Sequence, residues 1–101
     1  MVANAAAVHT RRWASAMAHR GHDVHVVSVR DEPIPDVTVH ATAIGPDSRP
    51  ATLSVGYLRL PTTIRGLHRS LRPEVIHAHY ASTNGLAVSL TGITPTVLTV
   101  W

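Results

Sequence analysis

Residues 20–29 read RGHDVHVVSV, and this stretch decides the fold class. Four of the six residues from 24 to 29 are valine, so the stretch is β-branched and nearly continuous in its apolar character. A strand that is covered by helices on both faces has this pattern, whereas a half-solvated strand alternates strictly. Residues 8–20 before it predict a helix that buries Trp13 and Met17, and Gly21 suits the left-handed residue that closes such a helix. Helix, glycine and buried strand together form the second half of a βαβ unit.

The rest of the chain repeats this alternation. A loop at 31–36, a strand at 37–44 and a loop at 45–52 are predicted next. A helix follows that has Pro61 in its first turn and ends at Pro73. The last predicted elements are a strand at 75–79, a helix from Ser82 or Thr83 to Leu90, and a strand at 96–100. Helices that alternate with buried strands predict an α/β fold with a parallel sheet and right-handed crossovers. We expect a single domain over residues 1–101.

Composition excludes several classes of function. Cysteine is absent, which excludes disulfides, thiolate metal sites and cysteine nucleophiles. The nine basic residues are all arginine and are scattered, so we expect no nucleic-acid partner. No apolar stretch approaches the ~20 residues that span a bilayer. The charges of the N-terminal stretch follow its small residues, the reverse of a secretory signal, so a cytoplasmic location is expected.

The stretch LRPEVIHAHY, residues 71–80, places two histidines at the end of a predicted strand. His77 and His79 share a face of that strand. No third ligand is evident, so we expect no metal site. A buried, hydrogen-bonded His77 is the simpler interpretation. His79 and Tyr80 lie at the carboxyl end of a parallel strand, where open α/β sheets bind ligands.

Three blocks of the sequence resemble the N-terminal domain of family 4 glycosyltransferases. They are RRWASAMAHRGHDVHVVS at 11–28, LHRSLRPEVIHAHYASTNGLA at 67–87 and GITPTVLTVW at 92–101. The family has the GT-B architecture of two Rossmann-like domains and transfers a sugar from a nucleotide-sugar to an acceptor hydroxyl with retention of configuration. The resemblance therefore implies a Rossmann-like sheet with helices on both faces, as part of an incomplete GT-B N-terminal domain.

The sequence departs from the family pattern at both ends. The family's first strand and its glycine-rich turn would precede Val8, where only MVANAAA stands. No pair of glutamates has the Glu-x7-Glu spacing of the family's donor domain. The resemblance therefore implies part of an acceptor-side domain, which alone has no turnover. A sheet without its first strand would also have an unpaired central edge, which predicts poor solubility or self-association.

The resemblance also indicates which residues face the substrates. His79, Tyr80, Asn84 and Gly85 are expected to line the cleft between the two domains. Trp101 stands where many members have a histidine near the transferred sugar, and a tryptophan there can stack on a sugar or simply pack.

Two residues of the first predicted helix are further candidates. His9 and Arg11 lie at its N-terminus, which favours anions such as a phosphate or an acidic sugar. An ordinary exposed first turn is the alternative, because the glycine turn that brings a phosphate close is missing.

The implied partners are a nucleotide-sugar donor and a glycan or lipid-linked acceptor, with no further cofactor. Peripheral membrane association stays open. The alternative function is a non-catalytic α/β module that binds a glycan or a partner. A dinucleotide-binding domain ranks behind both, because no glycine-rich first turn is present. Nucleic-acid binding would have to use Arg65, Arg69 and Arg72, which more simply form a solvated helix side.

Overall fold

The computed structural model describes residues 1–43 and 50–100. Its elements are α1 (Val8–His19), β1 (His25–Ser28), β2 (Thr38–Ala41), α2 (Pro50–Leu71), β3 (Ile76–His79), α3 (Thr83–Ser89) and β4 (Thr96–Thr99). β1 pairs with β2 and β3 pairs with β4, both in parallel. The α/β class and the parallel strands that the sequence predicted are confirmed.

Val2 joins the two strand pairs into one sheet. It forms parallel bridges to Val27 of β1 and to Ala78 of β3. The Val2 amide donates to the His77 carbonyl at 2.8 Å, and the His79 amide donates to the Val2 carbonyl at 2.9 Å. The spatial order is therefore β2-β1-Val2-β3-β4, which is the strand order of doubly wound nucleotide-binding folds when Val2 counts as the first strand.

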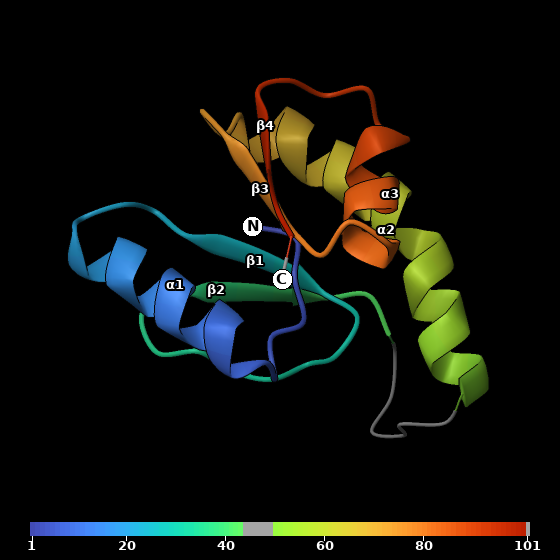
Figure 1. Cartoon of the computed structure of the whole chain (residues 1–101), viewed down its shortest axis with the longest axis horizontal. Helices are drawn as coiled ribbons and strands as arrows, with labels where there is room; N and C mark the ends of the chain where they lie inside the picture. Colours follow the sequence, from blue (N-terminus) through green and yellow to red (C-terminus); the bar gives the residue numbers. More distant parts are fainter. Residues whose placement is uncertain (44–49, 101) are drawn as a thin grey trace.

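The expectation of an unpaired central edge is thus wrong in part. Residues 1–3, which we call the central segment, occupy the middle of the sheet between β1 and β3 (Figure 1). Ala3 donates to the Val27 carbonyl at 3.0 Å, and the Val27 amide donates to the Met1 carbonyl at 2.8 Å. The segment is short, but hydrogen bonds to strands on both sides hold it, so the centre of the sheet is paired from Met1 onward.

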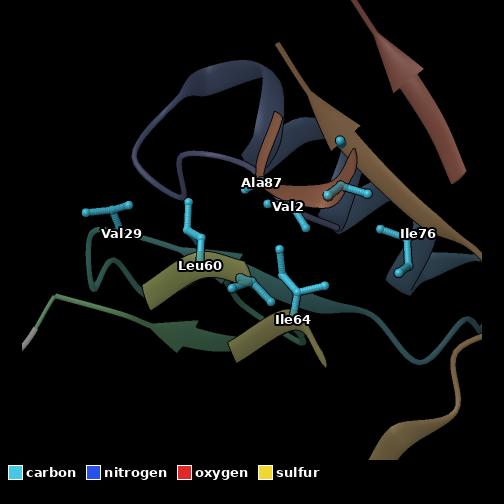
Figure 2. Close-up of a cluster of buried hydrophobic side chains, with 9 residues drawn as sticks. Val2, Val29, Leu60, Ile64, Ile76 and Ala87 are labelled. Carbon is cyan, nitrogen blue, oxygen red and sulfur yellow. The ribbon is translucent and has the colours of Figure 1, made fainter. Parts of the chain in front are cut away.

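Helices cover both faces of this sheet, as Figure 1 shows. α1 packs on one face through a small cluster that contains Ala5, Ala14, Val26 and Ile34. α2 and α3 cover the other face. The larger core cluster lies there, and Figure 2 shows strand residues such as Val2 and Ile76 facing Leu60 and Ile64 of α2. This arrangement is the Rossmann-like sheet with helices on both faces that the resemblance implied.

The start of the second helix was predicted wrongly. Pro61 lies inside α2, and the helix begins at Pro50 within the stretch predicted as a loop. A proline in a helix interior removes one backbone hydrogen bond and usually bends or ends the helix. Here Leu60 and Ile64 flank it and are buried, so tertiary packing outweighs the local signal. Residues 44–49, the rest of that predicted loop and the end of the predicted strand at 37–44, lie outside the described residues.

Two glycines of α2 give a matched test of this packing. A Cβ on the buried Gly56 would lie 2.8 Å from Val29 Cγ1 and 3.2 Å from both Ala43 Cβ and Ala43 N. A Cβ on Gly66 would meet nothing within 4 Å. We therefore expect Gly56→Ala to lower the free energy of unfolding by about 1–3 kcal/mol.

Gly66→Ala serves as the control, because it adds the same methyl group to an open part of the same helix. It should raise the free energy of unfolding by about 0.5–1 kcal/mol through helix propensity. Urea unfolding followed by circular dichroism measures both values. Equal effects of the two substitutions would contradict the close approach of α2 to β1.

Candidate functional site

A small cavity of about 160 Å³ lies where three parallel segments of the sheet end. We call it the carboxyl-end pocket. It is lined by Ala3, Asn4, Ser28, Val29, Arg30, Leu53, Tyr57 and Asn84. Ala3 and Asn4 follow Val2, residues 28–30 end β1 and leave it, and Asn84 lies in α3, directly after β3. The chain passes from the central segment through α1 to β1 on one side, and it returns from β2 through α2 to β3 on the other side. Open α/β sheets bind ligands at such a switch point of the strand order.

Ser28 shapes one wall of the pocket. Its side chain is 1% exposed. The Ser28 hydroxyl oxygen accepts hydrogen bonds from the backbone amides of Ala5 and Arg30, each at 3.1 Å. One buried hydroxyl thus fixes the loop after the central segment to the turn after β1. Asn4 makes a local turn there, since its side-chain oxygen accepts from the Ala6 amide at 3.0 Å.

Asn84 forms the opposite wall and is held by the end of β3. Its side-chain amide donates to the His79 carbonyl at 2.9 Å, and the residue is buried. The neighbouring Gly85 amide donates to the Tyr80 carbonyl at 2.9 Å. A Cβ on Gly85 would lie 3.0 Å from that same carbonyl oxygen and 3.0 Å from Leu98 Cδ1, so a side chain there would require these neighbours to shift.

Tyr80 connects β3 to α3 in a strained backbone conformation. Its φ of 69° lies in the left-handed region, which costs a residue with a side chain of the order of 1 kcal/mol or more. Its amide donates to the Thr99 carbonyl of β4 at 3.0 Å, which holds the turn in place. Residues in such conformations concentrate at ligand sites, and Tyr80 stands at the carboxyl end of the sheet where the sequence placed it.

The two histidines of β3 are not among the residues that line the pocket. His79 is fully buried, and its pKa is lowered to about 4, first by burial and then by the positive charges of His77, the N-terminus and His9. His77 Nε2 hydrogen-bonds to the Thr99 hydroxyl of the neighbouring strand, and its ring meets the His79 ring edge-on at a centroid distance of 4.6 Å. The expected hydrogen bond of His77 is confirmed, but its side chain is only partly buried. At neutral pH His79 is therefore an uncharged residue of the interior.

The other predicted site residues fall outside the lining. His9 is exposed at the start of α1, near enough for its charge to act on His79. Arg11 donates from its guanidinium to the Pro33 carbonyl at 2.9 Å and so links α1 to the loop after β1. Trp101 lies outside the described residues. Of the six predicted site residues that the structure describes, Asn84 lines the pocket. Tyr80 and Gly85 lie next to it in the turn from β3 into α3, where the Gly85 amide donates to the Tyr80 carbonyl.

Sequence reasoning missed four polar residues of the lining: Asn4, Ser28, Arg30 and Tyr57. Arg30 could have been found, because it is the first charged residue after a buried strand and so stands at that strand's carboxyl end. Asn4 was missed because residues 1–3 had not been assigned to the sheet. Tyr57 was missed because α2 was predicted to begin later than it does.

The chemistry of the carboxyl-end pocket favours an anionic or hydroxylated ligand. Arg30 supplies a positive charge, and Asn4, Ser28, Tyr57 and Asn84 supply groups that form hydrogen bonds. Its volume is well below the roughly 300–1,000 Å³ of pockets that enclose a small molecule. The described residues therefore do not enclose a small-molecule ligand by themselves.

Within residues 1–43 and 50–100, no three histidine or acidic side chains gather in a way that would hold a metal ion. In the same residues no helix has both the length and the apolar character needed to cross a bilayer.

Comparison with known proteins gives one match. The whole chain, residues 1–101, matches the family model described as glycosyl transferase 4-like. No curated protein sequence matches the chain significantly. No solved structure does so either.

Proposed function

Because the chain belongs to the glycosyl transferase 4-like family, we propose that it forms the acceptor-side wall of an enzyme that transfers a sugar from a nucleotide-sugar to an acceptor hydroxyl with retention of configuration. Glycosyl transfer, with a sugar donor and an acceptor as partners, is the general function that the match supports. The match over the full length of the chain is the observation that carries this proposal. The retaining mechanism, the nucleotide-sugar donor and the cytoplasmic site of action belong to the proposal.

The carboxyl-end pocket supports an acceptor role. Glycan and lipid-linked acceptors present hydroxyl groups, and the lipid-linked ones also present phosphate. Arg30 can pair with a phosphate, and the side chains of Asn4 and Tyr57 lie in the same lining and can bond sugar hydroxyls.

The residues predicted from the sequence take supporting roles in this proposal. Asn84 contributes to the pocket wall, while Tyr80 and Gly85 set the position of α3. His79 stays neutral and holds the strand end through packing. His9 and Arg11 are proposed to approach the substrates from the start of α1. A substrate contact of Trp101 remains part of the proposal only as the family resemblance implies it.

One observation favours the alternative of a non-catalytic binding module. Among the described residues that line the carboxyl-end pocket there is no aspartate, glutamate or histidine to act as general acid or base. On this alternative the same wall binds a glycan or lipid-linked sugar, and the chain supplies recognition without chemistry.

Substitution of Arg30 tests whether the carboxyl-end pocket binds a sugar phosphate, which both the acceptor-side proposal and the binding-module alternative require. We expect glucose 1-phosphate, which carries the sugar and phosphate groups of a lipid-linked acceptor, to shift the NMR signals of Arg30 and of the Asn84 side-chain amide. Arg30→Gln should raise the dissociation constant about fivefold, which corresponds to the loss of about 1 kcal/mol from a charge-assisted contact. Arg69→Gln is the matched control, because Arg69 is exposed in the last turn of α2, away from the residues that line the pocket, and should leave the constant within about twofold.

The possible outcomes separate the proposals. Shifts at the carboxyl-end pocket with a neutral disaccharide alone would favour the glycan-binding module. Shifts that map elsewhere, or equal effects of Arg30→Gln and Arg69→Gln, would contradict the assignment of this pocket as the sugar-phosphate site.

A further inference from the structure

Two histidine side chains meet across β1 and β2, which lie side by side in Figure 1. His25 begins β1, and His40 is the third residue of β2. Val27 lies opposite His40 in the parallel register, and His25 shares a face of its strand with Val27 because the two are two positions apart. Both imidazoles therefore stand on the same face of the sheet. Neither lines the carboxyl-end pocket, so this pair is separate from the site proposed above.

The two imidazole rings approach each other through their nitrogens. The ring planes are nearly parallel, with 16° between them, and the centroids are 5.3 Å apart. His25 Nδ1 and His40 Nε2 are 3.0 Å apart and share a hydrogen bond. One of these nitrogens must carry the proton of that bond, and the other must offer a lone pair.

Asp23 decides which nitrogen offers the lone pair. One of its carboxylate oxygens lies 3.2 Å from Nε2, the other ring nitrogen of His25. The negative charge favours a proton on Nε2, so Nδ1 is the nitrogen with the lone pair and His40 Nε2 donates to it. A carboxylate beside the outer nitrogen of a histidine is a common partner of metal-binding imidazoles, because it orients the ring and raises the basicity of the inner nitrogen.

The separation of the facing nitrogens suits one class of metal. Imidazole nitrogens bind divalent transition metals at about 2.0–2.1 Å, so two of them are about 2.9 Å apart at a right angle and about 3.4 Å apart at the tetrahedral angle. The observed 3.0 Å is close to the first value. Cu²⁺ and Ni²⁺ favour square-planar or tetragonal arrangements with right angles between neighbouring ligands, whereas Zn²⁺ favours the tetrahedron.

Solvent reaches this pair of side chains. The His25 side chain is 22% exposed and that of Asp23 is 89% exposed, and His40 is partly buried. An ion can therefore enter without any opening of the core, and water can take the remaining coordination positions. Within the described parts of the chain no group of three histidine or acidic side chains is placed to hold a metal, so the protein supplies two nitrogens and binding is reversible.

From these contacts, we propose that His25 and His40 form a two-histidine site for a divalent transition metal that prefers right-angled ligands, with Asp23 as the positioning residue of His25. The metal bonds to His25 Nδ1 and His40 Nε2 in place of the hydrogen bond between them. Small rotations of both rings about χ2, which is a soft torsion, turn the two lone pairs toward the ion. The His40 proton moves from Nε2 to Nδ1 through solvent, so both imidazoles stay neutral. The bound metal ties β2 to β1.

Titration of the ¹³C,¹⁵N-labelled chain with NiCl₂ at pH 7.5 tests the proposal. Ni²⁺ is paramagnetic and broadens the NMR signals of nuclei close to it. Of the eight histidines of the chain, His25 and His40 are expected to show the strongest broadening of their ring signals. The Irving–Williams order also predicts that Ni²⁺ binds more tightly than Zn²⁺.

Glutamine substitutions identify the ligands. His25→Gln and His40→Gln each keep a polar side chain and remove one imidazole, so each should raise the dissociation constant of Ni²⁺ by at least about tenfold. His19→Gln is the matched control, because it removes an exposed histidine of α1, and it should leave the constant within about twofold. Circular dichroism checks that each variant is folded, and His40→Gln, on the partly buried outer strand, carries the test if His25→Gln does not fold.

Asp23→Asn tests the positioning role. We expect it to raise the dissociation constant about tenfold and, without metal, to lower the share of His25 that carries its proton on Nε2, as long-range ¹H–¹⁵N spectra report. An Asp23 that acts only on stability would leave this tautomer unchanged. The proposal is overturned if broadening centres on other histidines, if both glutamine variants bind Ni²⁺ as the parent chain does, or if Zn²⁺ binds more tightly than Ni²⁺.

Discussion

Leu60→Ala is expected to lower the free energy of unfolding by about 2–5 kcal/mol. The Leu60 side chain is 1% exposed and belongs to the core cluster between α2 and the sheet. Its truncation removes apolar contact and leaves a cavity that the surrounding helices fill only in part. The free energy of unfolding of a small domain is only about 5–15 kcal/mol, so this single substitution removes a large fraction of it.

Leu58→Ala is the matched control, because Leu58 lies two positions earlier in α2 and is 80% exposed. It should change the free energy of unfolding by less than about 0.5 kcal/mol. Urea unfolding monitored by circular dichroism gives both values on the same helix. A Leu60→Ala effect below about 1 kcal/mol, or one equal to that of Leu58→Ala, would mean that α2 does not pack on the sheet as described.

Stability is also expected to fall as the solution becomes acidic. The pKa of His79 is lowered from 6.5 to about 4, mainly by burial. Above pH 6.5 the residue is neutral in the folded and unfolded chains, so it contributes no pH dependence. Between pH 6.5 and 4 the unfolded chain takes up the proton and the folded chain does not, so folding loses up to about 3 kcal/mol.

The Met1 amino group acts in the same direction at higher pH. Burial lowers its pKa from 8.0 to about 6, so the free energy of unfolding should already decline as the pH falls from 8 to 6. The pKa values of His40 and His77 are also lowered, each first by burial, and both add to the loss of stability in acid. The chain is therefore expected to be most stable above pH 8.

The substitution His79→Gln separates the contribution of His79 to the loss of stability in acid from the contributions of the other groups. Glutamine carries no charge at any of these pH values, so the loss of stability between pH 6.5 and 4 should become about 3 kcal/mol smaller than in the parent chain. Leu58→Ala, at an exposed position of α2 that carries no titratable group, is the control and should leave the profile unchanged. Equilibrium unfolding at pH 8, 6.5 and 4 measures the slopes. An unchanged acid slope in His79→Gln would show that this residue is not buried in its neutral form.

The sequence predicts the parallel α/β fold because the signal is local. The valine-rich stretch of β1 and the apolar entry into β3 are each recognisable from a few adjacent residues, and helices stand between them. The central segment could not be predicted in the same way. Residues 1–3 have no periodic pattern, and Val2 becomes a strand residue only because β1 and β3 both offer it hydrogen bonds.

The difference between local patterns and long-range contacts also explains which residues of the candidate site could be predicted. Asn84 could be predicted because it follows β3 directly along the chain. Arg30 and Asn4 meet it only through the order of the strands, and Tyr57 only through a helix that continues across Pro61. Each of these depends on contacts between residues that are distant in the sequence. Pattern and propensity alone do not contain that information.

The central claim is that Val2 joins two parallel strand pairs into one sheet, which places the carboxyl-end pocket where these parallel segments end. Nuclear Overhauser effects from Val2 in the ¹³C,¹⁵N-labelled chain test it most directly. The account predicts cross-peaks from the Val2 backbone to both Val27 and Ala78, in the pattern of parallel strands. Cross-peaks to one of the two alone, or an antiparallel pattern at either, would contradict it.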